Sequence, residues 1–118
     1  MVQLSTYEWK IMALIWDQEP QTITKLTKAL KEETGWSKYT VITYLKRLEA
    51  KGAVHYKEGE RAKLYYADIT RTDAQLQEID SFLDKVFSGK LGLMINTMIK
   101  EEKLSDSEID ELLNMLKK

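Results

Sequence analysis

Residues 36–54 read WSKYTVITYLKRLEAKGAV and decide how the rest of the chain is interpreted. Ser37 is typical of a helix N-cap, and Gly52 is typical of the left-handed residue that ends a helix. An apolar stripe with i, i+4, i+7 spacing lies between them and consists of Val41, Leu45 and Leu48. The remaining surface carries hydrogen-bonding and cationic groups: Lys38, Tyr39, Thr40, Thr43, Tyr44, Lys46 and Arg47. The stretch therefore predicts a helix over residues 38–51 with one face toward a core, although the same pattern also fits an ordinary amphipathic surface helix.

The overall composition is that of one soluble globular protein. The chain has 118 residues, of which 43% are hydrophobic and 31% charged. It contains no apolar run of the roughly 20 residues that cross a membrane, and its first residues do not form a basic segment followed by an apolar one. We therefore expect a cytoplasmic protein without membrane insertion.

Few residues in the chain could carry out catalysis or hold a metal. Cysteine is absent, which excludes disulfides, thiolate metal sites and cysteine nucleophiles. His55 is the one histidine, and the sequence offers it no convergent partners, so a polar strand residue is the simpler interpretation. Glycine-rich phosphate loops are also missing. We expect no enzyme activity, no cofactor and no metal site.

Charge is unevenly distributed along the chain. The net charge is −1 and the pI about 5.9, which is not the basic signature of many nucleic-acid-binding domains. Residues 1–71, however, hold 12 Lys and Arg against 9 Asp and Glu, a net charge of +3. Residues 72–118 hold 6 against 10, a net charge of −4. A basic half is thus joined to an acidic half.

Two further helices are predicted before the opening stretch. The first begins at a capping box, Ser5 to Glu8, and ends between Asp17 and Pro20. After a short extended piece, a second helix begins at Thr22 or Thr24 and ends at Thr34-Gly35. Only a tight turn containing glycine separates it from the Ser37 cap, which is the form of a helix-turn-helix.

Beyond Gly52 the apolar period changes from 3.6 to 2. Residues 54–57 and 63–67 alternate as strands, and residues 58–62 have the composition of a hairpin loop. Three helices followed by a hairpin make a winged helix, which we assign to residues 1–71. Lys57, Arg61 and Lys63 lie where such a wing would reach a phosphate backbone, although a generic solvated hairpin fits the loop equally well.

From Asp68 onward the pattern is helical, with a cap expected at Thr72 and a second capping box at Ser105 to Glu108. Residues 72–118 are too few to bury their apolar stripes among themselves, so we interpret them as a dimerisation module. The alternative is a helical cap folded back on the same subunit. The predicted interface residues are Leu76, Ile79, Leu83, Val86, Leu91, Met94, Ile95, Met98, Ile109, Leu112, Leu113 and Leu116. The predicted fold is therefore mainly α with a small β-hairpin, a winged helix-turn-helix followed by a helical dimerisation module.

Several segments in order along the chain resemble one known family. They are Glu8-Trp9, Ile15-Trp16-Asp17, Gly35-Trp36-Ser37, Lys51-Gly52-Ala53, Lys57-Glu58-Gly59, Tyr65-Tyr66, Ser81-Phe82-Leu83, Leu104-Ser105 and Glu108-Ile109-Asp110-Glu111-Leu112. In this order they resemble the penicillinase and methicillin-resistance repressors (the BlaI/MecI type, with the related CopY copper repressors).

The resemblance implies a homodimeric winged-helix transcriptional repressor on a palindromic operator. The helix matching residues 38–51 would enter the major groove, the hairpin over residues 54–67 would lie on the backbone, and the C-terminal helices would form the dimer. The residues carried over as candidates for DNA contact are Lys38, Tyr39, Thr40, Thr43, Tyr44 and Arg47, to which the cationic pattern adds Lys46, Lys57, Arg61 and Lys63.

The chain departs from the family at two points that concern induction. Copper repressors carry a cluster of cysteines, which this sequence lacks. Penicillinase-type repressors are cleaved at an Asn-Phe bond after signalling by a membrane sensor protease, and the matching bond here is Thr97-Met98, beside Asn96. Because the Asn-Phe pair is not kept, Thr97 and Met98 are named only as the position that matches the cleavage site.

Two other functions compete with the repressor. One is a winged helix used as a protein-interaction adaptor, which the low pI favours and the cations of the 38–51 helix oppose. The other is a ligand-responsive regulator with a pocket between the wing and the dimer helices, lined by Met94, Met98, Met115 and aromatic side chains. Methionine at helical spacing is more often part of a core. The operator, the regulated genes and the inducing signal are not encoded in these patterns.

Overall fold

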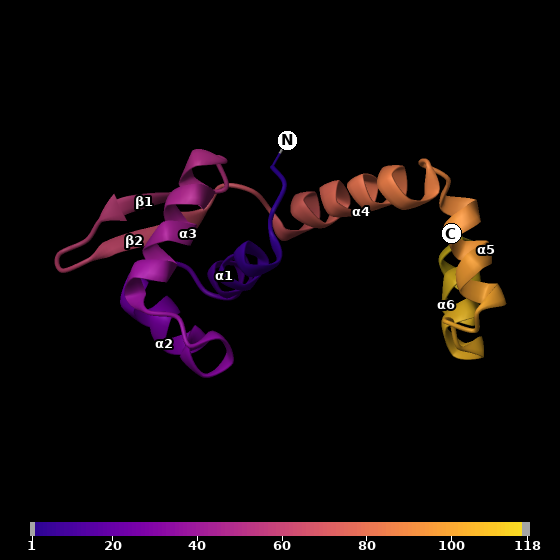
Figure 1. Ribbon diagram of the computed structural model, residues 1–118, viewed down its shortest axis with the longest axis horizontal. Helices are drawn as coiled ribbons and strands as arrows, with labels where there is room; N and C mark the ends of the chain where they lie inside the picture. Colours follow the sequence, from indigo (N-terminus) through magenta and orange to yellow (C-terminus); the bar gives the residue numbers. More distant parts are fainter. Residues whose placement is uncertain (1, 117–118) are drawn as a thin grey trace. The chain divides into compact units, whose positions relative to one another are not determined.

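The computed structural model describes residues 2–116, which fall into two compact units, one ending at Glu78 and the other beginning at Ile79 (Figure 1). The first unit contains α1 (Thr6–Asp17), α2 (Ile23–Thr34), α3 (Lys38–Ala50), β1 (Val54–Glu58) and β2 (Lys63–Ala67). Helix α4 (Arg71–Phe87) begins in the first unit and continues into the second, which also holds α5 (Leu91–Lys100) and α6 (Asp106–Leu116). These elements confirm the predicted fold class of helices with one small hairpin. The boundary between the units lies inside α4, whereas the sequence pattern sets the domain boundary after residue 71.

The predicted caps define the first three helices. Ser5 and Glu8 form a reciprocal capping box at the start of α1, with Ser5 N donating to Glu8 Oε1 at 2.7 Å. Thr22, rather than Thr24, caps α2 by accepting a hydrogen bond from the Lys25 amide at 3.1 Å. The Ser37 hydroxyl accepts from the Thr40 amide at the start of α3.

Helix α3 ends in a Schellman arrangement. The Ala53 amide donates to the Leu48 carbonyl at 2.9 Å, and the Gly52 amide donates to the Glu49 carbonyl at 3.0 Å. Gly52 has a φ of +78°, a conformation that a side chain would strain. This ending turns the chain directly into β1, and it leaves α3 one residue shorter than the predicted 38–51.

The core of the first unit is built by the apolar stripes of its three helices. Val41, Leu45 and Leu48 of α3 are fully buried. They belong to one cluster with buried side chains of α1, α2 and the hairpin: Ile11, Met12, Ile15, Leu26, Leu30, Val54 and Tyr65. The predicted apolar face of α3 is therefore confirmed, and it fixes which side of the helix points outward.

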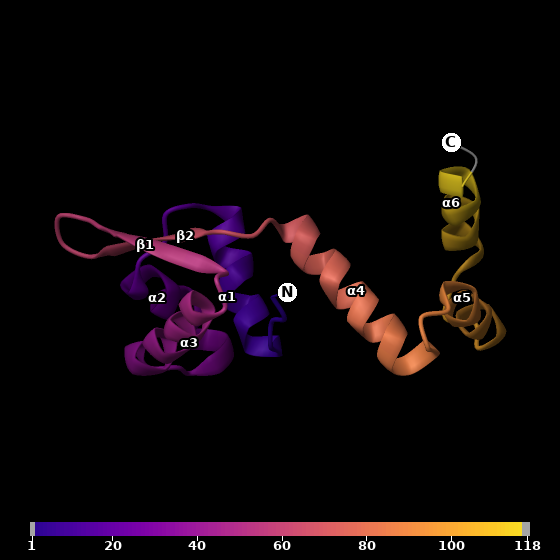
Figure 2. The same cartoon turned by 90° about the horizontal axis from the view of Figure 1, so that it is seen from above.

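The hairpin pairs β1 with β2 in antiparallel register, with Tyr56 opposite Tyr65 and Lys57 opposite Leu64. Figure 2 shows its loop extending away from the three helices. At the loop, a side chain on Gly59 would lie 2.6 Å from the Ala62 carbonyl oxygen, so only glycine fits there. Gln21 adds a bridge on the other side of β2 through two backbone hydrogen bonds to Tyr65, of 3.1 and 2.8 Å. This bridge ties the segment before α2 to the wing.

The C-terminal helices follow the predicted breaks, with one correction. Thr70, and not Thr72, caps α4, because its hydroxyl accepts from the Asp73 amide at 3.0 Å and the helix already begins at Arg71. Ser105 and Glu108 form the second capping box, with the Glu108 amide donating to Ser105 Oγ at 3.1 Å. Within residues 2–116, no helix has both the length and the apolar character to cross a bilayer.

Candidate nucleic-acid interface

The outward face of α3 collects most of the predicted contact residues. The side opposite the buried stripe exposes Lys38, Tyr39, Thr43, Lys46 and Arg47, with Tyr39 70% exposed. Thr40 and Tyr44 lie at the margin of this face and are half-buried. Successive turns of α3 therefore expose hydroxyl, phenol and cationic groups to solvent.

Thr43 is oriented by its own helix. Its hydroxyl donates to the Tyr39 carbonyl oxygen at 3.0 Å, so the proton is already used. What remains free is the methyl group and an acceptor lone pair. Such a side chain suits the thymine methyl or an exocyclic amino group in a major groove.

Tyr44 belongs to a cluster of aromatic side chains. Its ring stacks on Trp36 with centroids 4.9 Å apart and an interplanar angle of 26°. Tyr7 of α1 meets the same Trp36 edge-on at 5.3 Å. The Arg47 guanidinium lies over the Tyr44 ring, 5.2 Å from its centroid. The sequence pattern groups Tyr44 with the contact residues but gives no sign of this stacking, which joins residues from α1, the turn and α3.

The three wing cations do not share one face of the hairpin. Lys57 pairs with Leu64 and Lys63 pairs with Glu58, and adjacent pairs of an antiparallel ladder point to opposite faces. Lys57 lies over the Tyr66 ring at 5.3 Å, and Lys63 lies over the Tyr56 ring at 4.2 Å. Arg61 is exposed in the loop. A phosphate backbone that passes along one face of the wing could therefore contact Lys57 or Lys63 but not both. Arg61 lies in the loop, between the two strands.

Lys51 is occupied by an interaction that the sequence pattern missed. Its ammonium group lies 2.5 Å from Glu8 Oε1 and 2.8 Å from the Gln3 carbonyl oxygen. Burial by itself raises the pKa of Glu8, but hydrogen bonds from Lys51 and from Ser5 outweigh it and hold that pKa below its usual range. Lys51 thus fastens the end of α3 to the start of α1, and it is not a free cation of the α3 surface.

The predicted dimer residues fall into two sets. Along α4, a row with 3, 4, 3 spacing is formed by Leu76, Ile79, Leu83 and Val86, which we call the α4 row; all but the half-buried Leu83 are 49–53% exposed. In α5 and α6, Leu91 and Leu113 are about half exposed, whereas Met94, Ile95, Met98, Ile109 and Leu112 are half-buried. The side chain of Leu116 lies outside the described residues. The predicted interface set did not include several other apolar side chains of this region: Phe82, Leu93, Ile99, Leu104 and Met115.

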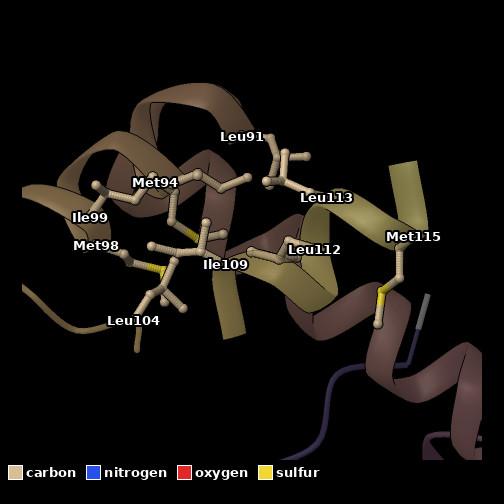
Figure 3. A pocket seen from close by; sticks show the side chains of 10 residues that line it. Leu91, Met94, Met98, Ile99, Leu104, Ile109, Leu112, Leu113 and Met115 are labelled. Carbon is tan, nitrogen blue, oxygen red and sulfur yellow. The ribbon is translucent and has the colours of Figure 1, made fainter. Parts of the chain in front are cut away.

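Side chains of α5, of α6 and of the segment between them line an apolar hollow of about 500 Å³ (Figure 3). It is lined by Leu91, Met94, Ile95, Met98, Ile99, Leu104, Ile109, Leu112, Leu113 and Met115. The three methionines of the predicted pocket thus line one hollow, but none of its lining comes from the wing. The Thr97-Met98 bond lies within α5, where Thr97 Oγ1 donates to the Leu93 carbonyl oxygen at 2.9 Å.

Three helices, a hairpin and an outward cationic helix face define a winged-helix DNA-binding domain of the kind found in transcriptional regulators. The comparison with protein families is more specific, because the penicillinase repressor family model matches residues 4–118. This chain belongs to the penicillinase repressor family, which confirms the resemblance inferred from its motifs. The family consists of transcriptional repressors and not of enzymes.

Individual relatives cover nearly the whole chain. The penicillinase repressor of Bacillus licheniformis is 34% identical over 115 residues, covering 97% of this chain and 89% of that protein. The methicillin resistance regulatory protein MecI of Staphylococcus aureus is 28% identical over 116 residues, covering 98% and 94%. A solution structure of monomeric Bacillus licheniformis BlaI in complex with the blaP half-operator has a TM-score of 0.53 and 31% identity, covering 60% of this chain and 87% of that one.

Proposed function

We propose that this protein is a homodimeric repressor that binds a palindromic operator, with α3 in the major groove and the hairpin on the backbone. The observation that carries the proposal is the outward face of α3, where Tyr39, Thr43 and Arg47 lie opposite the buried stripe. The BlaI structure bound to the blaP half-operator supports it, because the same fold holds that DNA. Two recognition helices of a dimer would address half-sites roughly 34 Å apart, one turn of B-DNA.

The DNA-binding part is tested by affinity and its salt dependence on a duplex from the promoter upstream of the chain's own gene. Arg47→Ala should weaken binding to promoter and scrambled duplexes alike and reduce the salt slope by about 0.9, the value for one phosphate contact. Thr43→Ala should instead change the preference between the two duplexes, by about 1–3 kcal/mol. Lys85→Ala, an exposed cation of α4, is the matched control and should change neither quantity. Absent or salt-insensitive binding by the native chain would reject this function in favour of a protein-interaction adaptor.

The dimeric part rests on apolar surface that the second unit leaves uncovered. No side chain described between Ile79 and Met115 is fully buried, and Ile79 and Val86 of the α4 row are each about half exposed. A unit of this size cannot close a core alone, and packing against a second copy would cover both the α4 row and the hollow between α5 and α6.

Oligomeric state decides the dimeric part directly. Val86→Asp should convert the dimer into a monomer, because it places an unpaired carboxylate in the interface. Light scattering measures this change as a halved mass. Lys85→Asp places the same group on the neighbouring residue and should leave the mass unchanged. A native chain that is monomeric at all accessible concentrations would contradict the dimer. An apolar compound that fills the hollow would then raise the melting temperature, as expected for a ligand-responsive regulator.

A further inference from the structure

An exposed cation on the outward face of α3, Arg47, lies over an aromatic ring. Arg47 is exposed, and within residues 2–116 it takes part in no ion pair. Its guanidinium lies 5.2 Å from the centroid of Tyr44, well within the range of a cation–π contact. The residue spacing is i, i+3, so both side chains lie on adjacent turns of one helix face.

The ring beneath Arg47 is itself fixed. Tyr44 stacks on Trp36 at 4.9 Å, and both rings pack on the core of the first unit. Tyr7 meets Trp36 edge-on at 5.3 Å and lies 6.2 Å from the Tyr44 ring, so the three rings form one cluster. Turning this ring aside would break its contacts with Trp36 and with the core, so these contacts favour the position in which the ring faces Arg47.

A second cation–tyrosine pair on α3 lacks this support. Lys38 lies 5.3 Å from the Tyr39 centroid, but Tyr39 is 70% exposed and contacts no other ring among the described residues. No second ring packs on Tyr39, so this pair lacks the support that Trp36 gives to Tyr44. Tyr39 and Tyr44 therefore differ in their surroundings, although the sequence pattern treats them alike.

We propose that Tyr44 is a positioning residue, whose clamped ring holds the Arg47 guanidinium ready for a phosphate oxygen of DNA and whose hydroxyl contributes no contact. A guanidinium that is already placed loses less rotamer freedom when it binds. Because Arg47 takes part in no ion pair within residues 2–116, its guanidinium N–H groups remain available to donate to a phosphate oxygen. The inference rests on the proposed function and assigns Tyr44 a role beside the contact residues.

The DNA test is a double-mutant cycle measured by anisotropy on a fluorescein-labelled duplex from the promoter upstream of the gene. Tyr44→Leu keeps apolar bulk but removes the ring, and it should weaken binding about threefold to tenfold. Tyr44→Phe keeps the ring and should bind within about twofold of the native protein. In an Arg47→Ala background, Tyr44→Leu should cost less than about twofold, because its effect acts through Arg47.

Two outcomes of this cycle would overturn the assignment. A loss with Tyr44→Phe as large as with Tyr44→Leu would mean that the hydroxyl contacts DNA. An equal loss from Tyr44→Leu with and without Arg47 would mean that the residue only supports the fold.

A measurement on the free protein separates this inference from the proposed function. The Arg47 side-chain NMR signals should be displaced by the ring current of Tyr44 in the native chain and in Tyr44→Phe, and not in Tyr44→Leu. Undisplaced signals in the native chain reject the pairing, whatever the DNA result. Displaced signals without any DNA binding would retain the pairing but reject both its phosphate role and the proposed function.

Discussion

Helices α3 and α4 carry apolar rows of similar spacing, but only the row of α3 is buried. Val41, Leu45 and Leu48 are fully buried, whereas Leu76 and Val86 in the α4 row are each 53% exposed. The difference shows that periodicity identifies the side of a helix that requires a partner, and not where the partner comes from. For α3 the partners are α1, α2 and the hairpin of the same unit. For α4 to α6 we propose a second copy.

The largest expected effect is on the unfolding of the first unit, which tryptophan fluorescence reports separately from the second. All three, Trp9, Trp16 and Trp36, lie in the first unit, so their fluorescence follows its unfolding alone. Leu45→Ala should lower the free energy of unfolding seen by fluorescence by about 2–5 kcal/mol, because it leaves a cavity in a fully buried site. The loss should not depend on protein concentration.

Leu91→Ala is the matched control in the second unit, where the same truncation falls on a side chain that is 51% exposed. It should leave the fluorescence transition unchanged and act on the concentration-dependent part of the circular dichroism transition. Equal effects of both substitutions on fluorescence would mean that the two units unfold as one.

A smaller effect distinguishes an ion pair whose carboxylate is buried from one whose carboxylate is exposed. Hydrogen bonds from Lys51 and Ser5 hold the pKa of Glu8 below its usual range. The ionised Glu8 therefore contributes its full stabilisation of the folded state at pH values above its pKa in the unfolded chain, near 4.5. That effect is lost as the pH falls through the lower folded pKa. Glu8→Gln should cost about 1–3 kcal/mol at neutral pH, and its difference from the native chain in urea unfolding should shrink below about pH 4.

Glu33→Gln provides the comparison for Glu8. Glu33 pairs with Lys10 across α1 and α2, but its side chain is 59% exposed. Removing this exposed charge should cost less than about 1 kcal/mol. A cost for Glu33→Gln equal to that for Glu8→Gln would show that burial of the carboxylate is unimportant.

Local patterns predicted most of the fold, because caps and apolar periods are recorded in consecutive residues. The Ser37 cap and both capping boxes are confirmed, while Thr70 replaces Thr72 because both residues can cap and only the first turn of the helix decides between them. The bridge from Gln21 to Tyr65 was not predictable, since a single pairing has no period.

Only the part of the candidate site that lies within one helix, α3, was predicted from the sequence. The outward residues of α3 follow from its apolar stripe. The pair of Lys51 with Glu8 and the stacking of Tyr44 on Trp36 join distant residues, and the sequence carried no local signal for them. The opposite faces of Lys57 and Lys63 follow from the strand register, which the loop composition alone could not fix.

The smallest expected effect compares two capping boxes with the same spacing. Ser5 and Ser105 each accept from the amide of a glutamate three residues later and receive its carboxylate in return. Hydrogen bonds from Ser105 lower the pKa of Glu108, as those from Ser5 contribute to the lowering at Glu8, yet Glu108 is fully exposed and Glu8 is buried.

Ser5→Ala should cost about 1 kcal/mol in the fluorescence transition, because it loosens a helix on which the core of the first unit depends. Ser105→Ala should leave that transition unchanged and shift the dissociation constant of the dimer by less than about tenfold, because α6 can fray without opening the first unit. If the two substitutions had the same effect on fluorescence, the second unit would unfold together with the first, and α6 could not fray independently of it.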